Sequence, residues 1–540
     1  MLVSPTALDS LLLIQVDEGS QALINFNCSV FLKMTVSTGT SIDESIPDTY
    51  GVTEAMSLAC ATAEDIIETD KMLSYLDEVA PAESEEGWLH RWEVLIDLED
   101  KVRDWLIGDC GVTVTSNHEV CKVLTFGSFR LGIIRPSSDI DTLVLIPSSV
   151  SRDRFFSEFI THILPLDPEV TECLPVTDAR VPIAKVMFRG VYLDILVASV
   201  PADTIVPDME SVDDSLIFQV DEKCMKSMNG IRVADKILKL VPNPKTFREA
   251  ARMIKFWAQA RCIYSNSVGY FGGVSWSMAV ARVCQLYPNF SAKQIVERFF
   301  YTYSSWPWDE HKPIVLCAPQ EMKIPPSLIR QQGPSVFSQF KDWNPQKYSS
   351  DRFQVMPVIT PIFPSHNTTY NCTDSQKRVI VDELKRGKEI IQLMQLSNGE
   401  MGWNILCSKC PFFSLFNSFL ELNIWASDEV ILTKFKGLVE SRIRSLIKNI
   451  EQQNPEISTR PHPDFFFSES SRSMGSFFIG LSLYQTKSEQ KISMKTAIDL
   501  FVSDTMEKSI LAPEWAEINS NNIKLEIRVT DSPFPKEQEK

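Results

Sequence analysis

The sequence has no long hydrophobic run. Its longest apolar stretches are short, strand-like pieces such as 143–146 (LVLI), far too short to cross a bilayer. No basic residue precedes the apolar stretch Leu11–Ile14, which argues against a secretory signal. The 12 cysteines follow no disulfide framework spacing. These absences predict a protein without a membrane partner whose cysteines stay reduced, as in the cytosol or the nucleus.

Positive charge is also scarce. Lysine and arginine number 53 against 70 acidic residues, and the formal net charge is −17. Since phosphate contacts need cations, this balance excludes a protein that coats nucleic acid over its whole surface. An enzyme that gathers its cations in one cleft is compatible with it. Cys407 and Cys410 have zinc or redox spacing, but no second pair accompanies them, which favours reduced structural cysteines.

The length of 540 residues predicts several domains, because one hydrophobic core does not grow that large. A small, polar leader covers 36–48, and Met34 at its start suggests that 1–33 is a non-native extension. Periodicity predicts a helix over 85–107, strands over 122–126, 140–146 and 191–197, and a helix over 246–261 opening with Thr246 and Glu249 in capping-box spacing. Pro-, Ser- and Gln-rich sequence at 319–350 predicts an insertion or linker.

Three aspartates lie in or beside the predicted strands. Asp139 and Asp141 are two residues apart, so their side chains point to one face of an extended strand. Carboxylates this close repel each other unless a cation lies between them, and Mg²⁺ takes carboxylate oxygens while leaving positions open for phosphate. Asp194 interrupts the apolar run VYLDILVA, where an unpartnered charge is costly to bury. Together they predict a two-metal site for nucleotidyl transfer, with Asp194 also placed to accept the hydroxyl proton.

Gly127 and Ser128 stand between a predicted strand and a probable helix. The glycine lets the backbone approach a phosphate closely, and the serine offers its N–H and hydroxyl. Alone, a Gly-Ser or an Asp-x-Asp is most often a turn. Their occurrence twelve residues apart, together with an aspartate embedded in a strand, favours a functional site.

These residues also carry a family resemblance. GS followed by D-x-D is the signature of the polymerase-β-like nucleotidyltransferases, and the flanking residues resemble eukaryotic-type nuclear poly(A) polymerases in particular. The resemblance covers roughly residues 50–505 through an ordered series of segments: 124–147 (LTFGSFRLGIIRPSSDIDTLVLIP), 181–198 (VPIAKVMFRGVYLDILVA), 213–218 (DDSLIF), 228–242 (MNGIRVADKILKLVP), 254–289, 356–371 (MPVITPIFPSHNTTYN), 438–447 (LVESRIRSLI) and 477–483 (FFIGLSL).

The resemblance implies a role for each matching residue. The metal-binding catalytic triad is matched by Asp139, Asp141 and Asp194, and the nucleotide-phosphate loop by Phe126, Gly127 and Ser128. The adenylate and triphosphate contacts are matched by Asn229, Lys255, Tyr264, Gly273 and Val274. Taken singly, Lys255 fits a solvent-facing helix, Tyr264 a core position and Gly273-Val274 a turn. Ile134-Arg135 replaces the His-Thr of many relatives, and Arg135 is a candidate for a bidentate phosphate contact.

The implied fold class is multidomain α/β and α+β, with a polymerase-β-like palm, a helical central domain and a ferredoxin-like, RNA-recognition-like C-terminal domain. The predicted boundaries are an extension at 1–48, the nucleotidyltransferase catalytic domain at 49–202, the central domain at 203–375, the RNA-binding domain at 376–531 and a polar tail at 532–540. Four cations of the last domain are predicted RNA contacts, although a solvated amphipathic helix shows the same pattern: Lys434, Lys436, Arg442 and Arg444.

The expected function is template-independent transfer of AMP from ATP to the 3′ end of RNA, with two Mg²⁺ or Mn²⁺ ions. The family implies a monomeric catalytic subunit that works in the nucleus with cleavage and polyadenylation proteins, although the sequence contains no evident import signal. Two alternatives stay open. One is a terminal transferase of the same superfamily with another nucleotide preference. The other is a non-catalytic RNA-binding scaffold, against which the presence of all three aspartates argues.

Overall fold

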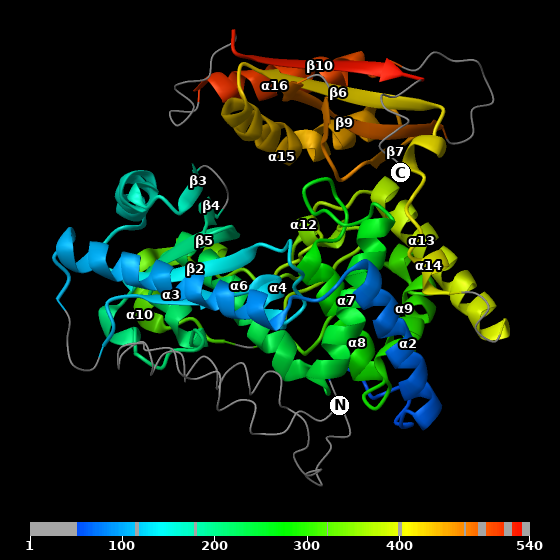
Figure 1. Ribbon diagram of the computed structural model, residues 1–540, viewed down its shortest axis with the longest axis horizontal. Coiled ribbons are helices and arrows are strands. Elements are labelled where there is room, and N and C mark those ends of the chain that lie inside the picture. Colours follow the sequence, from blue (N-terminus) through cyan, green and yellow to red (C-terminus); the bar gives the residue numbers. More distant parts are fainter. Residues whose placement is uncertain are drawn as a thin grey trace.

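The computed structural model describes residues 51–113, 118–177, 181–320, 322–397, 402–468, 471–483, 493–511 and 521–531. The predicted extension at 1–48 and the predicted tail at 532–540 lie outside these residues. Figure 1 shows three parts: a sheet with its covering helices, a group of helices beside it, and a second sheet above both. No helix among the described residues is long and apolar enough to span a membrane.

The first part is built on a five-stranded sheet of order β1-β2-β5-β4-β3. Its strands are β1 (Lys122–Thr125), β2 (Ile140–Pro147), β3 (Val170–Val176), β4 (Ile183–Phe188) and β5 (Val191–Val200). Only β2 and β5 pair in parallel. One face packs against α3 (Glu85–Gly108) and the π-helix η2 (Phe155–Ile163), and the other against α6 (Glu222–Leu240). The predicted helix at 85–107 and the three predicted strands are confirmed.

Alternation along β5 determines which side chains reach the site. Leu193 and Ile195 pack toward α3, whereas Leu196 packs toward α6. Asp194 is two residues before Leu196 and shares its face. The strand is buried on both faces and therefore reads as a nearly continuous apolar run. Asp194 therefore lies on the face of β5 opposite to that of Leu193 and Ile195.

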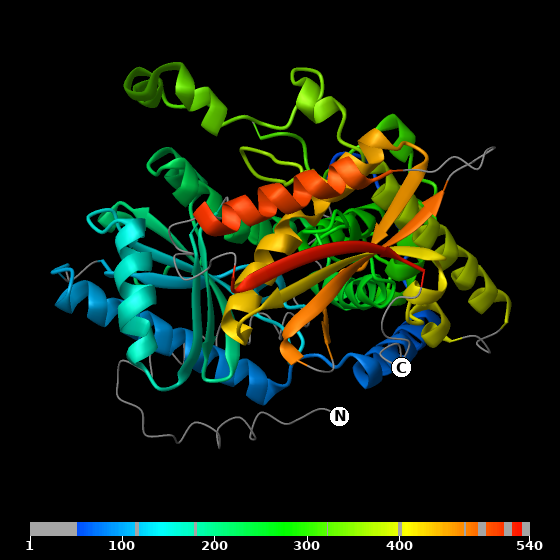
Figure 2. The same cartoon turned by 90° about the horizontal axis from the view of Figure 1, so that it is seen from above.

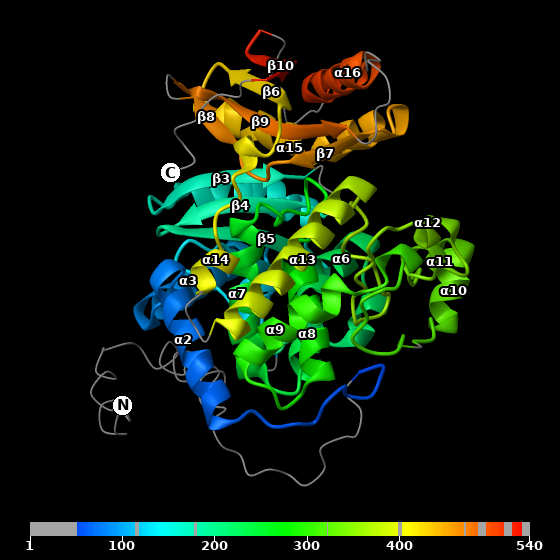
Figure 3. The same cartoon turned by 90° about the vertical axis from the view of Figure 1, so that its right-hand side faces the viewer.

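The second part is helical. Its longer helices are α2 (Ala63–Val79), α7 (Pro244–Ala260), α8 (Gly273–Leu286), α9 (Ala292–Ser304) and α13 (Asp374–Leu396), and the short α14 (Trp403–Leu406) follows. Figure 3 shows α13 lying along α9. The predicted capping box of Thr246 and Glu249 is wrong. The helix begins at Pro244, and the Asn243 side chain caps it by accepting from the N–H groups of Lys245 and Thr246. Proline suits this first position because it has no N–H to satisfy.

The segment at 319–350, predicted to be an insertion or a linker, contains packed helices. It holds α10 (Pro326–Gln332) and α11 (Val336–Gln339), and α12 (Ser349–Arg352) follows. Val336 and Phe340 are buried in the core that α6 shares with the first sheet. The ring of Phe340 lies 5.0 Å from that of Phe218 and 6.1 Å from that of Phe363. A few well-spaced apolar residues anchor this otherwise polar segment.

The third part has the order β6 (Ser418–Ala426), α15 (Glu429–Gln453), β7 (Ile457–Pro461), β8 (Phe466–Ser468), β9 (Ser471–Leu483), α16 (Lys495–Leu511) and β10 (Ile523–Thr530). Its antiparallel sheet has the order β10-β6-β9-β7, and β8 pairs with β9. Apart from β8, this is the βαββαβ order of a ferredoxin-like domain. Figure 2 shows β10 and α16 lying over the central helices. The predicted fold class is confirmed.

Candidate active site

The parallel pairing of β2 and β5 brings the predicted aspartates together. Asp141 and Asp194 are direct register partners, and Asp139 immediately precedes β2. Burial raises the pKa of Asp141 to about 7, and repulsion from Asp139 and Asp194 adds to this effect. Burial also raises the pKa of Asp194, against the attraction of Lys185 on the neighbouring strand. The three carboxylates therefore form a site whose negative charge is only partly compensated.

The turn between β1 and α4 (Gly127–Leu131) is folded around Asp141. The Ser128 N–H donates to the Asp141 carboxylate, and the Phe126 N–H donates to its backbone carbonyl at 2.9 Å. Gly127 has φ +59°, and a Cβ atom there would lie 1.8 Å from Asp141 Oδ2. Only glycine fits this position, because a side chain would both strain the backbone and displace the carboxylate. Gly127-Ser128 thus lies directly against the aspartate site.

Arg91 of α3 holds the loop that leads into Asp139. Its Nη1 donates to the Ser138 carbonyl and its Nη2 to the Pro136 carbonyl, both at 2.8 Å. Its Nε donates to Glu83 at 2.7 Å in an ion pair that is almost fully buried. Because both carbonyls lie within three residues of Asp139, this guanidinium fixes the backbone from which the aspartate projects. Sequence reasoning missed Arg91, since no local pattern connects it to this loop.

Two cations approach the aspartates, Lys255 from α7 and Arg135 from the loop between α4 and β2. Lys255 on α7 is drawn by Asp139 and Asp141, although burial and the nearby Arg135 lower its pKa. Within the described part of the chain, its ammonium makes no ion pair. Arg135 Nη2 donates to Gln259 Oε1 at 2.5 Å, and its buried Nε has no protein partner. A pair of incompletely satisfied cations beside carboxylates is suited to a triphosphate.

Asn229 lies on α6, next to the glycine that packs against Phe126 of the phosphate loop. The Asn229 carboxamide oxygen accepts from Arg232 Nη1 at 2.8 Å, which leaves its amide N–H groups for a ligand. Arg232 is itself held by Asp214 at 2.7 Å and by the Phe363 carbonyl at 2.7 Å. The ring of Phe126 packs closely against Gly230, since a Cβ atom on Gly230 would lie 2.4 Å from the ring. Gly230 is therefore needed after Asn229 because α6 packs closely against the phosphate loop at this position.

Tyr264 follows α7 and points back toward the aspartates. Burial raises its pKa to about 12, with Asp139 and Asp141 contributing. Its hydroxyl lies against the first turn of α8, where a Cβ atom on Gly273 would be 2.5 Å from the Tyr264 oxygen. Gly273 therefore sets the position of the tyrosine ring. Val274 is 38% exposed at the start of the same helix.

The predicted RNA contacts all lie on α15 but differ in their surroundings. Arg442 is ion-paired with Asp504 and donates to Thr505 at 3.1 Å, so it is engaged within its own domain. Lys436 lies over the rings of Phe465 and Phe467, and Arg444 lies 5.8 Å from the centre of the Tyr370 ring. These last cations face aromatic groups rather than carboxylates, which suits contact with a nucleic acid strand better.

The aspartate set also suits a divalent metal. Among the described residues, no three His, Cys, Asp or Glu side chains already surround a metal-sized position. Mg²⁺ nevertheless needs only one or two carboxylates, because water and substrate phosphates supply the other ligands. Asp141 and Asp194 are in register, and burial, together with repulsion from neighbouring carboxylates, raises the pKa of both. The donor chemistry therefore fits such an ion.

Comparison with known proteins identifies the family. The models of the poly(A) polymerase nucleotidyltransferase domain and of the poly(A) polymerase central domain match residues 51–241 and 246–409. Poly(A) polymerase PAPalpha of Candida albicans is 39% identical over 415 residues, which are 75% of this chain and 70% of that relative. The chain belongs to the poly(A) polymerase family.

Other poly(A) polymerases extend the likeness. Poly(A) polymerase of Dictyostelium discoideum is 35% identical over 497 residues, 89% of this chain and 58% of that relative. Nuclear poly(A) polymerase 2 of Arabidopsis thaliana is 37% identical over 438 residues, 80% of this chain and 52% of that relative. The chain thus spans little more than half the length of these two proteins. A solved structure of the Cid1 poly(U) polymerase has a TM-score of 0.44 and 14% sequence identity, and the match covers 64% of this chain and 99% of the Cid1 chain. A likeness this weak supports no conclusion on nucleotide choice.

Proposed function

We propose that this member of the poly(A) polymerase family adds AMP from ATP to the 3′ end of RNA without a template and releases pyrophosphate. The observation that carries the proposal is the register pairing of Asp141 with Asp194, with Lys255 and Tyr264 close enough to Asp139 and Asp141 to interact with them electrostatically. This arrangement provides sites for metal, triphosphate and base within one region between the sheet and the helices.

Asp139, Asp141 and Asp194 would hold two Mg²⁺ or Mn²⁺ ions, which lower the pKa of the RNA 3′-hydroxyl and neutralise the leaving pyrophosphate. Asp194 would also accept the hydroxyl proton, directly or through water. Lys255 and the unpartnered Nε of Arg135 would bind the triphosphate oxygens.

Recognition of adenine would come from the residues around Tyr264. The tyrosine ring offers a stacking face, and the free amide N–H groups of Asn229 offer hydrogen bonds. Gly273 keeps the ring at the base of α8, and Val274 would line the pocket edge. A pocket of this kind discriminates between nucleotides by roughly 1–3 kcal/mol where it relies on shape, and by more where it relies on unpaired polar groups.

The RNA would be held by α15 and by proteins of the cleavage and polyadenylation machinery, with this chain as a monomeric catalytic subunit in the nucleus. Lys434, Lys436 and Arg444 are the candidate phosphate contacts, and Arg442 supports the helix that carries them. The nuclear assignment is supported by Arabidopsis relatives that are named nuclear poly(A) polymerases.

Primer extension tests the proposal. Purified protein is given an unstructured RNA, Mg²⁺ or Mn²⁺, and each nucleoside triphosphate separately, with Asp141→Ala as the matched control. A ladder with ATP alone that disappears in Asp141→Ala is the expected result. A preference for UTP or CTP would identify a terminal transferase of another specificity. Folded protein that extends with no nucleotide would indicate the scaffold alternative.

A further inference from the structure

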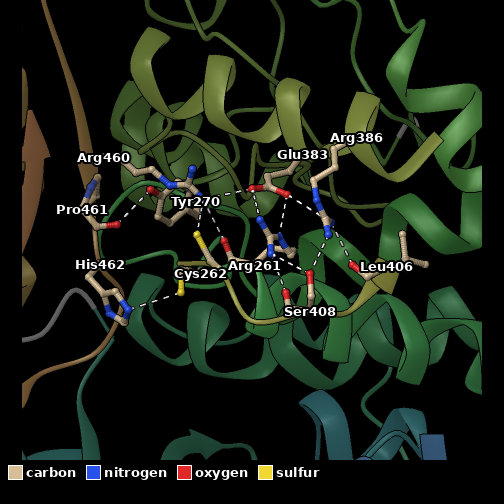
Figure 4. Close-up of polar contacts among 11 residues, drawn as sticks. Arg261, Cys262, Tyr270, Glu383, Arg386, Leu406, Ser408, Arg460, Pro461 and His462 are labelled. Carbon is tan, nitrogen blue, oxygen red and sulfur yellow. Dashed lines mark hydrogen bonds and ion pairs between the residues drawn. The ribbon is translucent and has the colours of Figure 1, made fainter. Parts of the chain in front are cut away.

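A buried polar junction joins the end of α7 to the C-terminal domain (Figure 4). Glu383 of α13 accepts from Arg261 Nε at 2.9 Å and from Arg460 Nη2 at 3.3 Å, so two guanidinium groups share one carboxylate. Arg460 Nη2 also donates to the Arg261 carbonyl at 3.1 Å. Tyr270 donates to the Pro461 carbonyl at 3.0 Å. This junction is separate from the aspartate site and takes no part in the proposed transfer reaction.

Two cysteines lie in the same junction. The Cys410 N–H donates to the Ala260 carbonyl at 2.8 Å, which fixes Cys410 beside the end of α7. The Cys262 thiol donates to the Cys410 sulfur, and Arg460 Nη2 donates to that sulfur at 3.2 Å. Cys262 is held at φ +56°, a conformation that side chains rarely adopt. The two thiols are therefore neighbours in the fold although 148 positions separate them in the chain.

His462 completes the cluster from the C-terminal domain. Its Nδ1 accepts from the Asp464 N–H at 3.0 Å. Burial lowers its pKa to about 4, so the ring is neutral and its proton is on Nε2. Nε2 lies 3.4 Å from Cys262 Sγ and donates to it. Each sulfur thus receives one hydrogen bond from a nitrogen donor. For Cys410 the donor is a guanidinium, whose charge stabilises a thiolate.

We propose that Cys262 and Cys410 are a peroxide-sensitive thiol pair that forms a disulfide across this junction. Sequence spacing points to Cys407 as the partner of Cys410, but the structure places Cys262 there. Cys407 is instead buried in the main hydrophobic core. The disulfide would fasten α7, which also carries Lys255, to the segment that enters the C-terminal domain.

The oxidation has two steps, formation of a sulfenic acid on Cys410 and its resolution by Cys262. The hydrogen bond from Cys262 and the charges of Arg460 and Arg261 lower the pKa of Cys410, so its thiolate is the nucleophile. That thiolate attacks one oxygen of hydrogen peroxide, the O–O bond breaks, and Cys410 sulfenic acid and hydroxide form. Hydroxide removes the Cys262 proton to give water. The Cys262 thiolate then attacks the sulfenic sulfur, the S–O bond breaks, and a disulfide and a second hydroxide are produced.

Peptide mass spectrometry of the folded, full-length protein tests the proposal. After brief exposure to hydrogen peroxide and alkylation of free thiols, the expected product is one linked peptide pair containing Cys262 and Cys410, with the loss of two hydrogens. Dithiothreitol should reverse it. The link should persist in Cys407→Ser, the matched control, and disappear in Cys262→Ser and Cys410→Ser.

The order of the steps is tested with dimedone, which traps sulfenic acids. The Cys262→Ser variant should carry the adduct on Cys410, because the resolving thiol is gone, whereas Cys410→Ser should carry none on Cys262. The proposal is overturned if the wild-type protein keeps both thiols reduced, or if Cys410 pairs with Cys407. The wild-type experiment decides between these results even where a variant fails to fold.

Discussion

Replacing Gly273 with alanine should weaken ATP binding through Tyr264. The new methyl group would lie 2.5 Å from the Tyr264 oxygen, while the next ring atom, Cζ, is 3.6 Å away, which is ordinary contact. The hydroxyl alone therefore causes the clash. Overpacking of this kind costs about 1–3 kcal/mol. If the cost falls on the ring position that adenine needs, KM for ATP should rise roughly 5- to 150-fold.

A double-mutant cycle separates this mechanism from general damage. Tyr264→Phe removes the clashing oxygen, so KM for ATP in Gly273→Ala/Tyr264→Phe should return to within about 0.5 kcal/mol of Tyr264→Phe alone. Steady-state primer extension with varied ATP measures all four proteins. Gly108→Ala serves as the control, because a Cβ atom there meets nothing within 4 Å. Additive effects of the two substitutions, with no rescue, would refute the steric reasoning.

Three further predictions concern the aspartate site. Gly127→Ala should remove extension activity while circular dichroism shows that the protein stays folded. The new methyl group would lie 1.8 Å from Asp141 Oδ2, and the positive φ of this residue costs a non-glycine side chain about 1–2 kcal/mol. A variant with normal activity would contradict the role given to the turn. Mn²⁺ at 100 times its Kd should raise the free energy of unfolding by about 2.7 kcal/mol, and this gain should vanish in Asp141→Asn. Thermal unfolding with and without Mn²⁺ measures the gain, and equal shifts in both proteins would argue against metal binding at Asp141. Arg91→Lys should weaken Mn²⁺ binding in a calorimetric titration, because lysine cannot reach both carbonyls before Asp139; unchanged affinity would show that Arg91 only stabilises the fold.

The strongest sequence predictions depended on short-range patterns. Asp139 and Asp141 share a strand face by simple alternation, and the apolar run around Asp194 identified the second strand. The sequence could not show that β2 and β5 pair in parallel with Asp141 opposite Asp194, because register is a property of two distant segments. Here the family resemblance supplied what local patterns could not.

The errors and omissions have the same origin. The α7 cap was misplaced because a capping-box spacing inside the helix imitates a true start, whereas Asn243 before Pro244 is the real one. The composition of 319–350 did not show that the segment is packed, because only two buried residues, Val336 and Phe340, hold it in place. Lys185 could have been identified from the sequence, because it lies in the alternating pattern of β4. In the structure it is the register partner of Asp194.

The shared carboxylate of Glu383 limits how this protein can be divided or recombined. Arg261 and Glu383 both lie in the region matched by the central-domain model, whereas Arg460 lies beyond it in the C-terminal domain. A chimera that exchanges only the C-terminal module and lacks an arginine at position 460 would leave buried charges mismatched, at a cost of about 3–5 kcal/mol. Grafting experiments should therefore transfer these three positions as a set, and sequence drift at any one of them should be accompanied by change at the other two.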